Sequence, residues 1–295
     1  MRKKSARPVL PTLLALLCCL AASPARAAGL EVAAGIAPVK HFVERIGGAR
    51  VSVALMVPAG ADAHAYEPKP SHMRAVSRAR AYFAVGLEFE RAWTRRYLAA
   101  NPGLVIVDTD QGIAKQPLPG HHHAAAAHRH DEGPDVHVWV APRLARRMAE
   151  RILEALSALD PAHAAEFAAN HRAFMREIEA LDAELAAMFA DVPAKRRVFM
   201  VFHPAWGYFA AAYGLTQVPV EAGGREPGPR ALARIIDQAR EHGVLVVFVQ
   251  PQVSDRVARS IARAVGGQVV AADPLAEDWA ANLRRVGQAF RAAMR

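Results

Sequence analysis

The sequence predicts an α/β protein built as two lobes, each with a sheet of parallel-type strands, joined by one long rigid helix. Two observations carry this prediction. Short apolar runs alternate with helical patterns along most of the chain, which is typical of α/β architectures. In the middle, a single helical pattern of about 30 residues interrupts the alternation, and at 1.5 Å per residue it is too long for an ordinary crossover.

The chain begins with a segment, residues 1–27, that has the pattern of a secretory signal. Basic residues open it, Val9–Ala22 form a short apolar stretch, and Ala25-Arg26-Ala27 fits a cleavage site. The apolar stretch is too short for a membrane-spanning helix. We therefore expect a mature protein that begins near Ala28 and is soluble outside the cytoplasm.

Composition narrows the class of protein. The formal net charge of the whole chain is +9. The leader contains five basic and no acidic residues, so the rest of the chain has a net charge of +4. The remaining arginines form no basic stripe with interleaved aromatic residues, so no nucleic-acid partner is expected. Cys18 and Cys19 are the only cysteines and both lie in the leader. The mature chain therefore has neither disulfides nor cysteine zinc sites.

Residues 28–158 are predicted to form the N-terminal lobe. Continuous apolar runs favour parallel strands covered on both faces, and Ser71 is expected to cap a helix through Arg80. Residues 115–134 form a low-complexity segment bracketed by proline and glycine, which favours a mobile loop. The predicted strands are Glu31–Ile36, Val51–Val57, Ala81–Val85, Val105–Val107 and Val136–Val140.

Residues 159–192 are predicted to form the connecting helix. Asp160 and Pro161 open it, and its apolar residues recur at the spacing of one helix face. These residues are Phe167, Phe174, Ile178, Leu181, Leu185 and Met188.

Residues 193–295 are predicted to form the C-terminal lobe. Pro229 opens a helix through Glu241, and Ser254 caps one through Val265. The predicted strands are Arg197–Phe202, Thr216–Val220, Val244–Val249 and Gln268–Ala272.

Four side chains near predicted strands form a candidate metal site in the cleft between the lobes: His64, His137, His203 and Asp273. Ligands of α/β sheets gather outside the carboxyl ends of strands, and three imidazoles with one carboxylate complete a tetrahedral shell for Zn²⁺. Imidazole suits zinc, whereas Mn²⁺ prefers a larger share of oxygen ligands. The ligand types alone do not exclude Cu²⁺, Ni²⁺ or Co²⁺.

Each of these residues also has a purely structural explanation. His137 lies among valines and fits a core histidine, while Asp273 precedes Pro274 and fits a turn or a helix cap. Glu67 is an alternative fourth ligand, although the turn Tyr66-Glu67-Pro68 explains it without a metal. The joint presence of four suitable side chains favours the metal site.

The low-complexity segment carries a second group of potential metal ligands. Neutral imidazoles in such a loop bind metal weakly and would gather zinc for the cleft. The alternative is a solvated linker of biased composition. The histidines concerned are His121, His122, His123, His128 and His130.

Five motifs resemble one known family, the zinc-specific solute-binding proteins of bacterial ABC transporters (TroA-like superfamily, ZnuA type). The resemblance implies a periplasmic receptor that delivers zinc to a permease in the inner membrane, expected as a monomer. It also implies that His64, His137 and His203 bind the metal, with Asp273 or water as fourth ligand. The chain departs from the family at Pro204, where aspartate is common. The motifs are His64-Ala-Tyr-Glu-Pro, Asp135-Val-His-Val-Trp-Val-Ala-Pro142, Val201-Phe-His-Pro-Ala-Trp-Gly-Tyr-Phe209, Gly224-Arg-Glu-Pro-Gly-Pro229 and Asp273-Pro-Leu.

Other functions fit the same residues. A periplasmic zinc buffer or chaperone would use the site without a transporter, and a manganese receptor would use it with another ion. A secreted zinc hydrolase would need Asp273 as general base, but the chain has no His-Glu-x-x-His motif. We therefore expect a binding protein and no enzyme.

Overall fold

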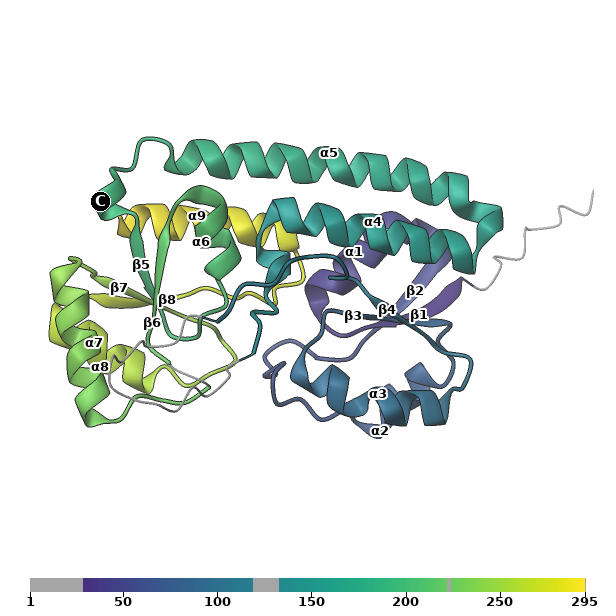
Figure 1. Ribbon diagram of the computed structural model, residues 1–295, viewed down its shortest axis with the longest axis horizontal. Helices are drawn as coiled ribbons and strands as arrows, with labels where there is room; N and C mark the ends of the chain where they lie inside the picture. Colours follow the sequence, from purple (N-terminus) through teal and green to yellow (C-terminus); the bar gives the residue numbers. More distant parts are fainter. Residues whose placement is uncertain (1–28, 119–132, 222–223, 295) are drawn as a thin grey trace, which may run out of the picture.

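The computed structural model describes residues 29–118, 133–221 and 224–294. Two four-stranded sheets, parallel throughout, form two lobes side by side, which confirms the predicted fold class (Figure 1). The first sheet has the order β2-β1-β3-β4 and the second the order β6-β5-β7-β8. The strands are β1 (Leu30–Ala34), β2 (Val51–Leu55), β3 (Ala81–Ala84), β4 (Val105–Asp108), β5 (Val198–Val201), β6 (Thr216–Pro219), β7 (Val246–Val249) and β8 (Gln268–Ala271).

Helices cover both faces of the first sheet. α2 and α3 lie on one face, and α1 and α4 lie on the other, between the sheet and α5 (Figure 1). Covering on both faces explains why β3 is apolar and buried at all four positions. The elements are α1 (Ala37–Gly47), η1 (Gly48–Arg50), α2 (Pro70–Val76), α3 (Glu88–Ala100), η2 (Val138–Val140) and α4 (Pro142–Leu159).

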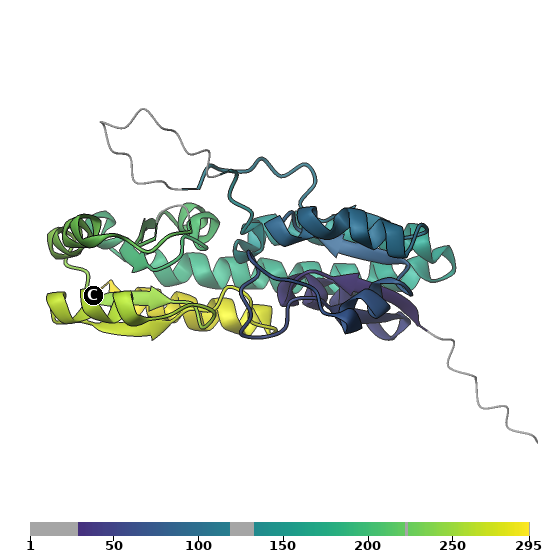
Figure 2. The same cartoon turned by 90° about the horizontal axis from the view of Figure 1, so that it is seen from below.

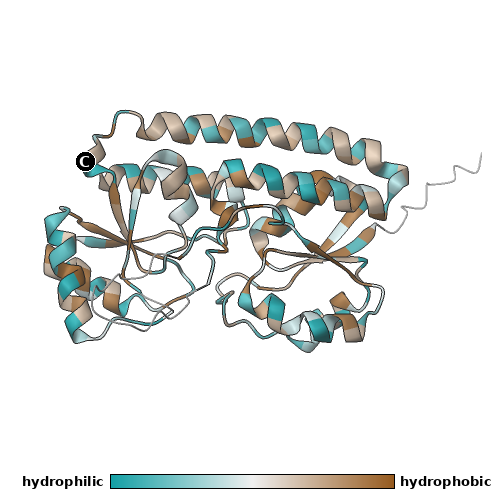
Figure 3. Cartoon of the chain, in the orientation of Figure 1, coloured by the Kyte–Doolittle hydropathy of each residue, from teal (hydrophilic) through white to brown (hydrophobic). Residues whose placement is uncertain are grey.

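The second sheet is covered in the same way. α7 and α8 pack on its outer face, while α6 and α9 lie between the sheet and α5 (Figure 1). The strands are the most apolar parts of this lobe, and the outer helices carry hydrophilic residues on their exposed sides (Figure 3). The helices are α6 (Gly207–Tyr213), α7 (Pro229–Glu241), α8 (Arg256–Val265) and α9 (Trp279–Ala293), and η4 (Ala194–Arg196) precedes the first strand.

The long helix of the central segment is α5 (Ala164–Phe189), 26 residues that follow a 3-10 turn, η3 (Pro161–His163). It runs along both lobes (Figures 1 and 2) and packs on α1 and α4 in one lobe and on α9 and α6 in the other. Its buried face matches the predicted one except at its end, where Phe189 is buried and Met188 is only partly so.

The start of α9 forms a second link between the lobes. The indole Nε1 of Trp279 donates to the carbonyl of Trp139 at 2.7 Å, and the indole Nε1 of Trp139 donates to the carbonyl of Pro274, also at 2.7 Å. The Trp279 ring packs edge-on against Phe42 of α1, with centroids 5.0 Å apart. These contacts attach the segment after β8 to the N-terminal lobe, so the lobes are joined by more than one helix.

Most predicted strands extend one or two residues beyond the observed ones, α5 is shorter than the predicted 159–192, and three further predictions differ from the structure. Val136–Val140 is not a strand: its end is the 3-10 turn η2, and the amide of Val138 donates to the carbonyl of Val136. A short buried apolar run does not distinguish a strand from a turn by its pattern alone. Helix α2 begins at Pro70 and not after Ser71, and it ends at Val76, short of Arg80.

Helix α8 begins one residue later than predicted, because Asp255 and not Ser254 precedes its first residue.

None of the helices in the described part of the chain combines the length and the hydropathy that crossing a bilayer requires. The leader, residues 1–27, lies outside the described residues.

Candidate metal centre

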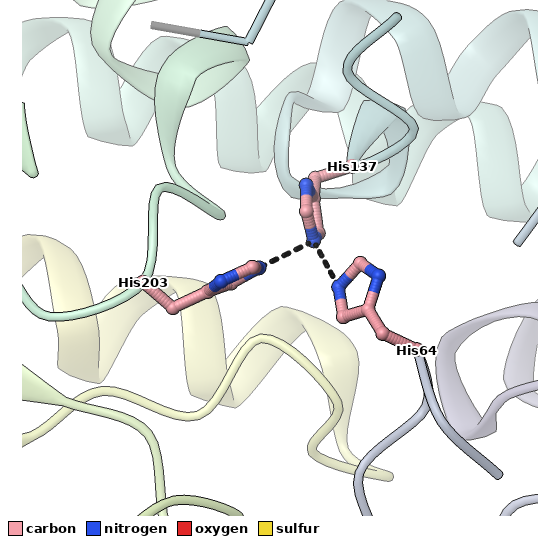
Figure 4. Close-up of side chains that lie close together, drawn as sticks. All are labelled: His64, His137 and His203. Carbon is pink, nitrogen blue, oxygen red and sulfur yellow. Dashed lines mark hydrogen bonds between the residues drawn. The ribbon is translucent and has the colours of Figure 1, made fainter. Parts of the chain in front are cut away.

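Three histidines from distant parts of the sequence meet between the lobes (Figure 4). His64 lies in the loop after β2, His137 immediately precedes η2, and His203 follows β5. The Nε2 atom of His137 lies 3.2 Å from Nε2 of His64 and 3.3 Å from Nε2 of His203. All three candidate ligand atoms lie within 4.8 Å of one another. Three imidazole nitrogens at this separation can bind one metal ion.

A carboxylate lies behind each imidazole. Nδ1 of His64 lies 2.9 Å from Glu88, Nδ1 of His137 lies 2.7 Å from Asp135, and Nδ1 of His203 lies 2.8 Å from Glu221. A ring that donates its Nδ1–H to a carboxylate presents the lone pair of Nε2, which is the tautomer that a metal requires. The three pairs therefore orient all the rings toward one point.

The loops hold these side chains by local hydrogen bonds. The carboxylate of Asp62 accepts the backbone N–H of His64 at 2.9 Å. Asp135 accepts the backbone N–H of His137, also at 2.9 Å, with the same oxygen that contacts the ring. Aspartate two residues before a histidine commonly forms such a turn. In His137 the same carboxylate thus fixes both the ring and the backbone.

The rings differ in their environment. The side chain of His137 is 3% exposed, against 29% for His64. Burial lowers the pKa of His137 to about 4, despite the opposing effect of Asp135, so this imidazole is neutral at physiological pH. For His64 burial acts in the same direction, but the hydrogen bond and charge of Glu88, with the charges of Asp62 and Glu221, outweigh it and raise the pKa.

The carboxylate behind His64 is correspondingly stabilised in its ionised form. The hydrogen bond from His64 is the main cause that lowers the pKa of Glu88 to about 2. A negative charge behind an imidazole increases its basicity as a metal ligand. The centre thus combines three nitrogen ligands with carboxylates that compensate the charge of a cation.

Asp273 does not join the histidines. It follows β8, but its Oδ1 accepts hydrogen bonds from the side chain of Gln252 and from the backbone of Leu275, both at 2.9 Å. Glu67, the other candidate, is exposed and likewise outside the group of histidines. The structure therefore brings together three of the four predicted residues, and a ligand role for Asp273 stays a prediction.

The five histidines of the low-complexity segment, His121, His122, His123, His128 and His130, lie outside the described residues.

Sequence reasoning missed the three carboxylates. Asp135 had a local signal, because it stands two residues before His137 in Asp-Val-His. Glu221 had a weaker one, since it follows β6 at the same sheet edge as His203. Nothing in the sequence links Glu88 at the start of α3 with His64, because that pairing depends on how the loop folds over the helix.

A small cavity of about 10 Å³ adjoins the three rings. Its lining includes the three histidines, Trp139, Gln252 and Leu275. A cavity of this size holds about one water molecule. The centre thus has room for one small ligand in addition to the imidazoles.

Comparison with known proteins identifies the family to which this fold belongs. Residues 32–293 match the family model described as "Zinc-uptake complex component A periplasmic" (ZnuA). A crystal structure of ZnuA superposes with a TM-score of 0.84 at 37% identity, covering 91% of this chain and 100% of that one. A zinc-bound ZnuA deletion mutant superposes with a TM-score of 0.83 at 38% identity, over 90% and 98% of the two chains.

The relatives also include proteins named for another metal. The manganese-binding lipoprotein MntA of Halalkalibacterium halodurans is 28% identical over 228 residues, which are 77% of this chain and 72% of that protein. The match to the family model nevertheless spans nearly the whole described chain. The chain therefore belongs to the ZnuA family, the TroA-like metal-binding receptors of periplasmic ABC transport.

Proposed function

We propose that this protein is a high-affinity periplasmic zinc receptor that delivers Zn²⁺ to an ABC permease in the inner membrane. One observation carries the proposal: the Nε2 atoms of His64, His137 and His203 converge while each Nδ1 contacts a carboxylate. Such an arrangement supplies three nitrogen ligands whose rings are already oriented before the ion arrives.

The choice of zinc rests on the donor atoms. Imidazole suits zinc, whereas Mn²⁺ favours carboxylate, carbonyl and water oxygens. All three gathered candidate ligands are nitrogens, and the nearest carboxylates are occupied with the Nδ1 atoms. The zinc-bound relative supports the same choice, although a manganese-binding relative also matches the chain.

Binding fits the centre better than hydrolysis does. A hydrolase needs a base beside the metal-bound water. Asp273, the base that such an enzyme would use, has Oδ1 engaged by Gln252 and Leu275 and lies apart from the histidines. A zinc buffer or chaperone would use the same binding site. Such a protein differs from a receptor in one observable way: only a receptor supports zinc uptake through a cognate permease.

The histidine-rich segment completes the proposal. His121, His122, His123, His128 and His130 lie in the chain between β4 and His137. We infer that they collect zinc with lower affinity and pass it to the centre. Their imidazoles have the same preference for zinc as those of the centre.

Calorimetric titration of the mature chain with Zn²⁺ tests the proposal. We expect one tight site and a weaker class of sites. His203→Ala removes one nitrogen ligand and should weaken only the tight site, by more than about 100-fold, because even residues behind the ligands contribute 10- to 100-fold. The control is His242→Ala, an exposed histidine in the same lobe.

Two results would contradict the proposal. An equal loss of affinity in both variants would show that the cleft histidines are not the tight site. Tighter binding of Mn²⁺ than of Zn²⁺ in direct competition would reject zinc as the natural ion.

A further inference from the structure

Gln252 lies in the loop after β7 and lines the cavity beside the three histidines. Its amide Nε2 donates to Oδ1 of Asp273 at 2.9 Å. The backbone N–H of Leu275 donates to the same oxygen, and the side chain of Asn282 donates to the backbone carbonyl of Asp273 at 2.6 Å. Asp273 is therefore held at three points, and it does not line the cavity.

The other end of the same amide has no partner. Oε1 of Gln252 is buried and accepts no hydrogen bond from any described residue. A buried acceptor without a donor is costly, and native proteins usually satisfy it with water or a ligand. The amide orientation is consistent with its neighbour, because only the NH₂ group can donate to the carboxylate of Asp273.

A metal-bound water would satisfy this oxygen. A water molecule that gives its lone pair to a cation is left with two hydrogens to donate, and an amide oxygen is a pure acceptor. The cavity beside the histidines has the size of about one water. Three imidazoles occupy three positions of a tetrahedral zinc shell, which leaves one position for that water.

We propose that Gln252 selects the fourth ligand of the bound ion: its Nε2 holds Asp273 away, and its Oε1 accepts a hydrogen bond from the water that completes the shell. The inference rests on the proposed function, since it concerns the same ion. The same arrangement also favours zinc over manganese. A shell of three imidazoles and one water supplies a single oxygen, fewer than Mn²⁺ prefers.

Cobalt provides the measurement, because Co²⁺ can replace zinc and absorbs visible light according to its ligands. A water bound to such an ion loses a proton between about pH 7 and 9, whereas a carboxylate ligand does not titrate in this range. We expect the visible spectrum of the wild-type cobalt protein to change above pH 7, as the bound water loses one proton. The Asp273→Asn variant should show the same spectrum, titration and zinc affinity as the wild type.

Gln252→Leu removes the hydrogen bond to Asp273 and the oxygen that would accept from the water. The side chain of Asp273 then keeps only the backbone N–H of Leu275 as a donor, so we expect its carboxylate to turn toward the ion and displace the water, and the titration should disappear. In the double variant Gln252→Leu/Asp273→Asn the carboxylate is gone, so the titration should return. This return distinguishes a released Asp273 from general damage to the loop, because damage would be equal or greater in the double variant.

Each contrary outcome overturns the inference. A wild-type spectrum that does not change above pH 7 would show that no water is bound. A loss of zinc affinity in Asp273→Asn would show that Asp273 is a ligand, and an unchanged titration in Gln252→Leu would show that Gln252 does not control the position. If the wild type bound neither zinc nor cobalt tightly, the proposed function itself would fail.

Discussion

Glu90 is a fully buried carboxylate at the start of α3, outside the metal centre. Its Oε2 accepts the backbone N–H groups of Val85 and Leu87 at 3.0 and 2.9 Å, and its Oε1 accepts the hydroxyl of Tyr82 at 3.2 Å. Burial nevertheless raises the pKa of Glu90 to about 7. A Cβ at Gly35 would lie 2.0 Å from Oε1, so only glycine fits beside this carboxylate.

This pKa predicts a pH-dependent stability. The folded state binds a proton at Glu90 up to about pH 7, whereas the unfolded chain releases it near 4.5. The native state therefore binds more protons between these values, and the contribution of Glu90 to stability falls as the pH rises from about 4.5 to 7. The full effect is at most about 3 kcal/mol, at 1.36 kcal/mol per pH unit.

Glu90→Gln should remove that pH dependence, because the amide keeps the shape and an acceptor oxygen without titrating. Urea unfolding of the metal-free protein at a series of pH values between 4.5 and 7.5 measures it. Glu241→Gln, at an exposed position at the end of α7, is the control. Parallel pH profiles for the wild type and Glu90→Gln would show that Glu90 does not titrate in this range.

At the scale of elements, the contact of α9 with α5 depends on a glycine. A Cβ at Gly287 would lie 2.9 Å from Cδ2 of Leu185 and 3.2 Å from Sδ of Met188. Glycine costs about 1 kcal/mol relative to alanine inside a helix. The close approach of the two helices explains why it is nevertheless used at this buried position.

We expect Gly287→Val to destabilise the protein by about 1–3 kcal/mol, because its branched side chain would overpack the contact between α5 and α9. Gln288→Val places the same side chain at the adjacent exposed position of α9 and should change stability by only a few tenths of a kcal/mol. Urea unfolding with the metal chelated compares the two. Equal stability of the two variants would mean that α9 can shift to accept the extra volume.

On the scale of the whole molecule, one hydrophobic core extends through both lobes. Phe42 and Phe83 of the first lobe, Phe174 of α5 and Phe290 of α9 belong to the same cluster of buried residues. The outer face of the second sheet has a separate cluster, which includes Val247 and lies under α7 and α8. A continuous core resists separation of the lobes, because opening would expose the apolar side chains that it buries.

Metal binding should therefore cause only small movements, mainly in the loops around the centre. For a chain of about 268 residues the radius of gyration is roughly 18 Å, and we expect zinc to change it by less than about 1 Å. Small-angle X-ray scattering of the metal-free and zinc-bound mature protein measures this value. A decrease of several ångströms would show hinge closure and contradict a rigid pair of lobes.

The sequence by itself determined the fold class, because burial on both faces requires continuous apolar strands and the long helix needs one apolar face. The apolar runs around Ala81 and Val246 became buried strands, and the pattern from Phe167 to Leu185 became the buried face of α5. The alternation of strands and helices also placed His64 and His203 near strand ends, where side chains of a sheet converge.

Only the tertiary structure decided which of these side chains meet. Folding pairs each imidazole with a carboxylate, which for His64 is Glu88, 24 residues later in the chain. It also places the side chain of Asp273 against Gln252 instead of among the histidines. It also made Val138–Val140 a buried turn that carries Trp139 to the start of α9. A sequence pattern records how far each residue is buried, whereas such contacts depend on loop paths and on packing between elements that are distant in the chain.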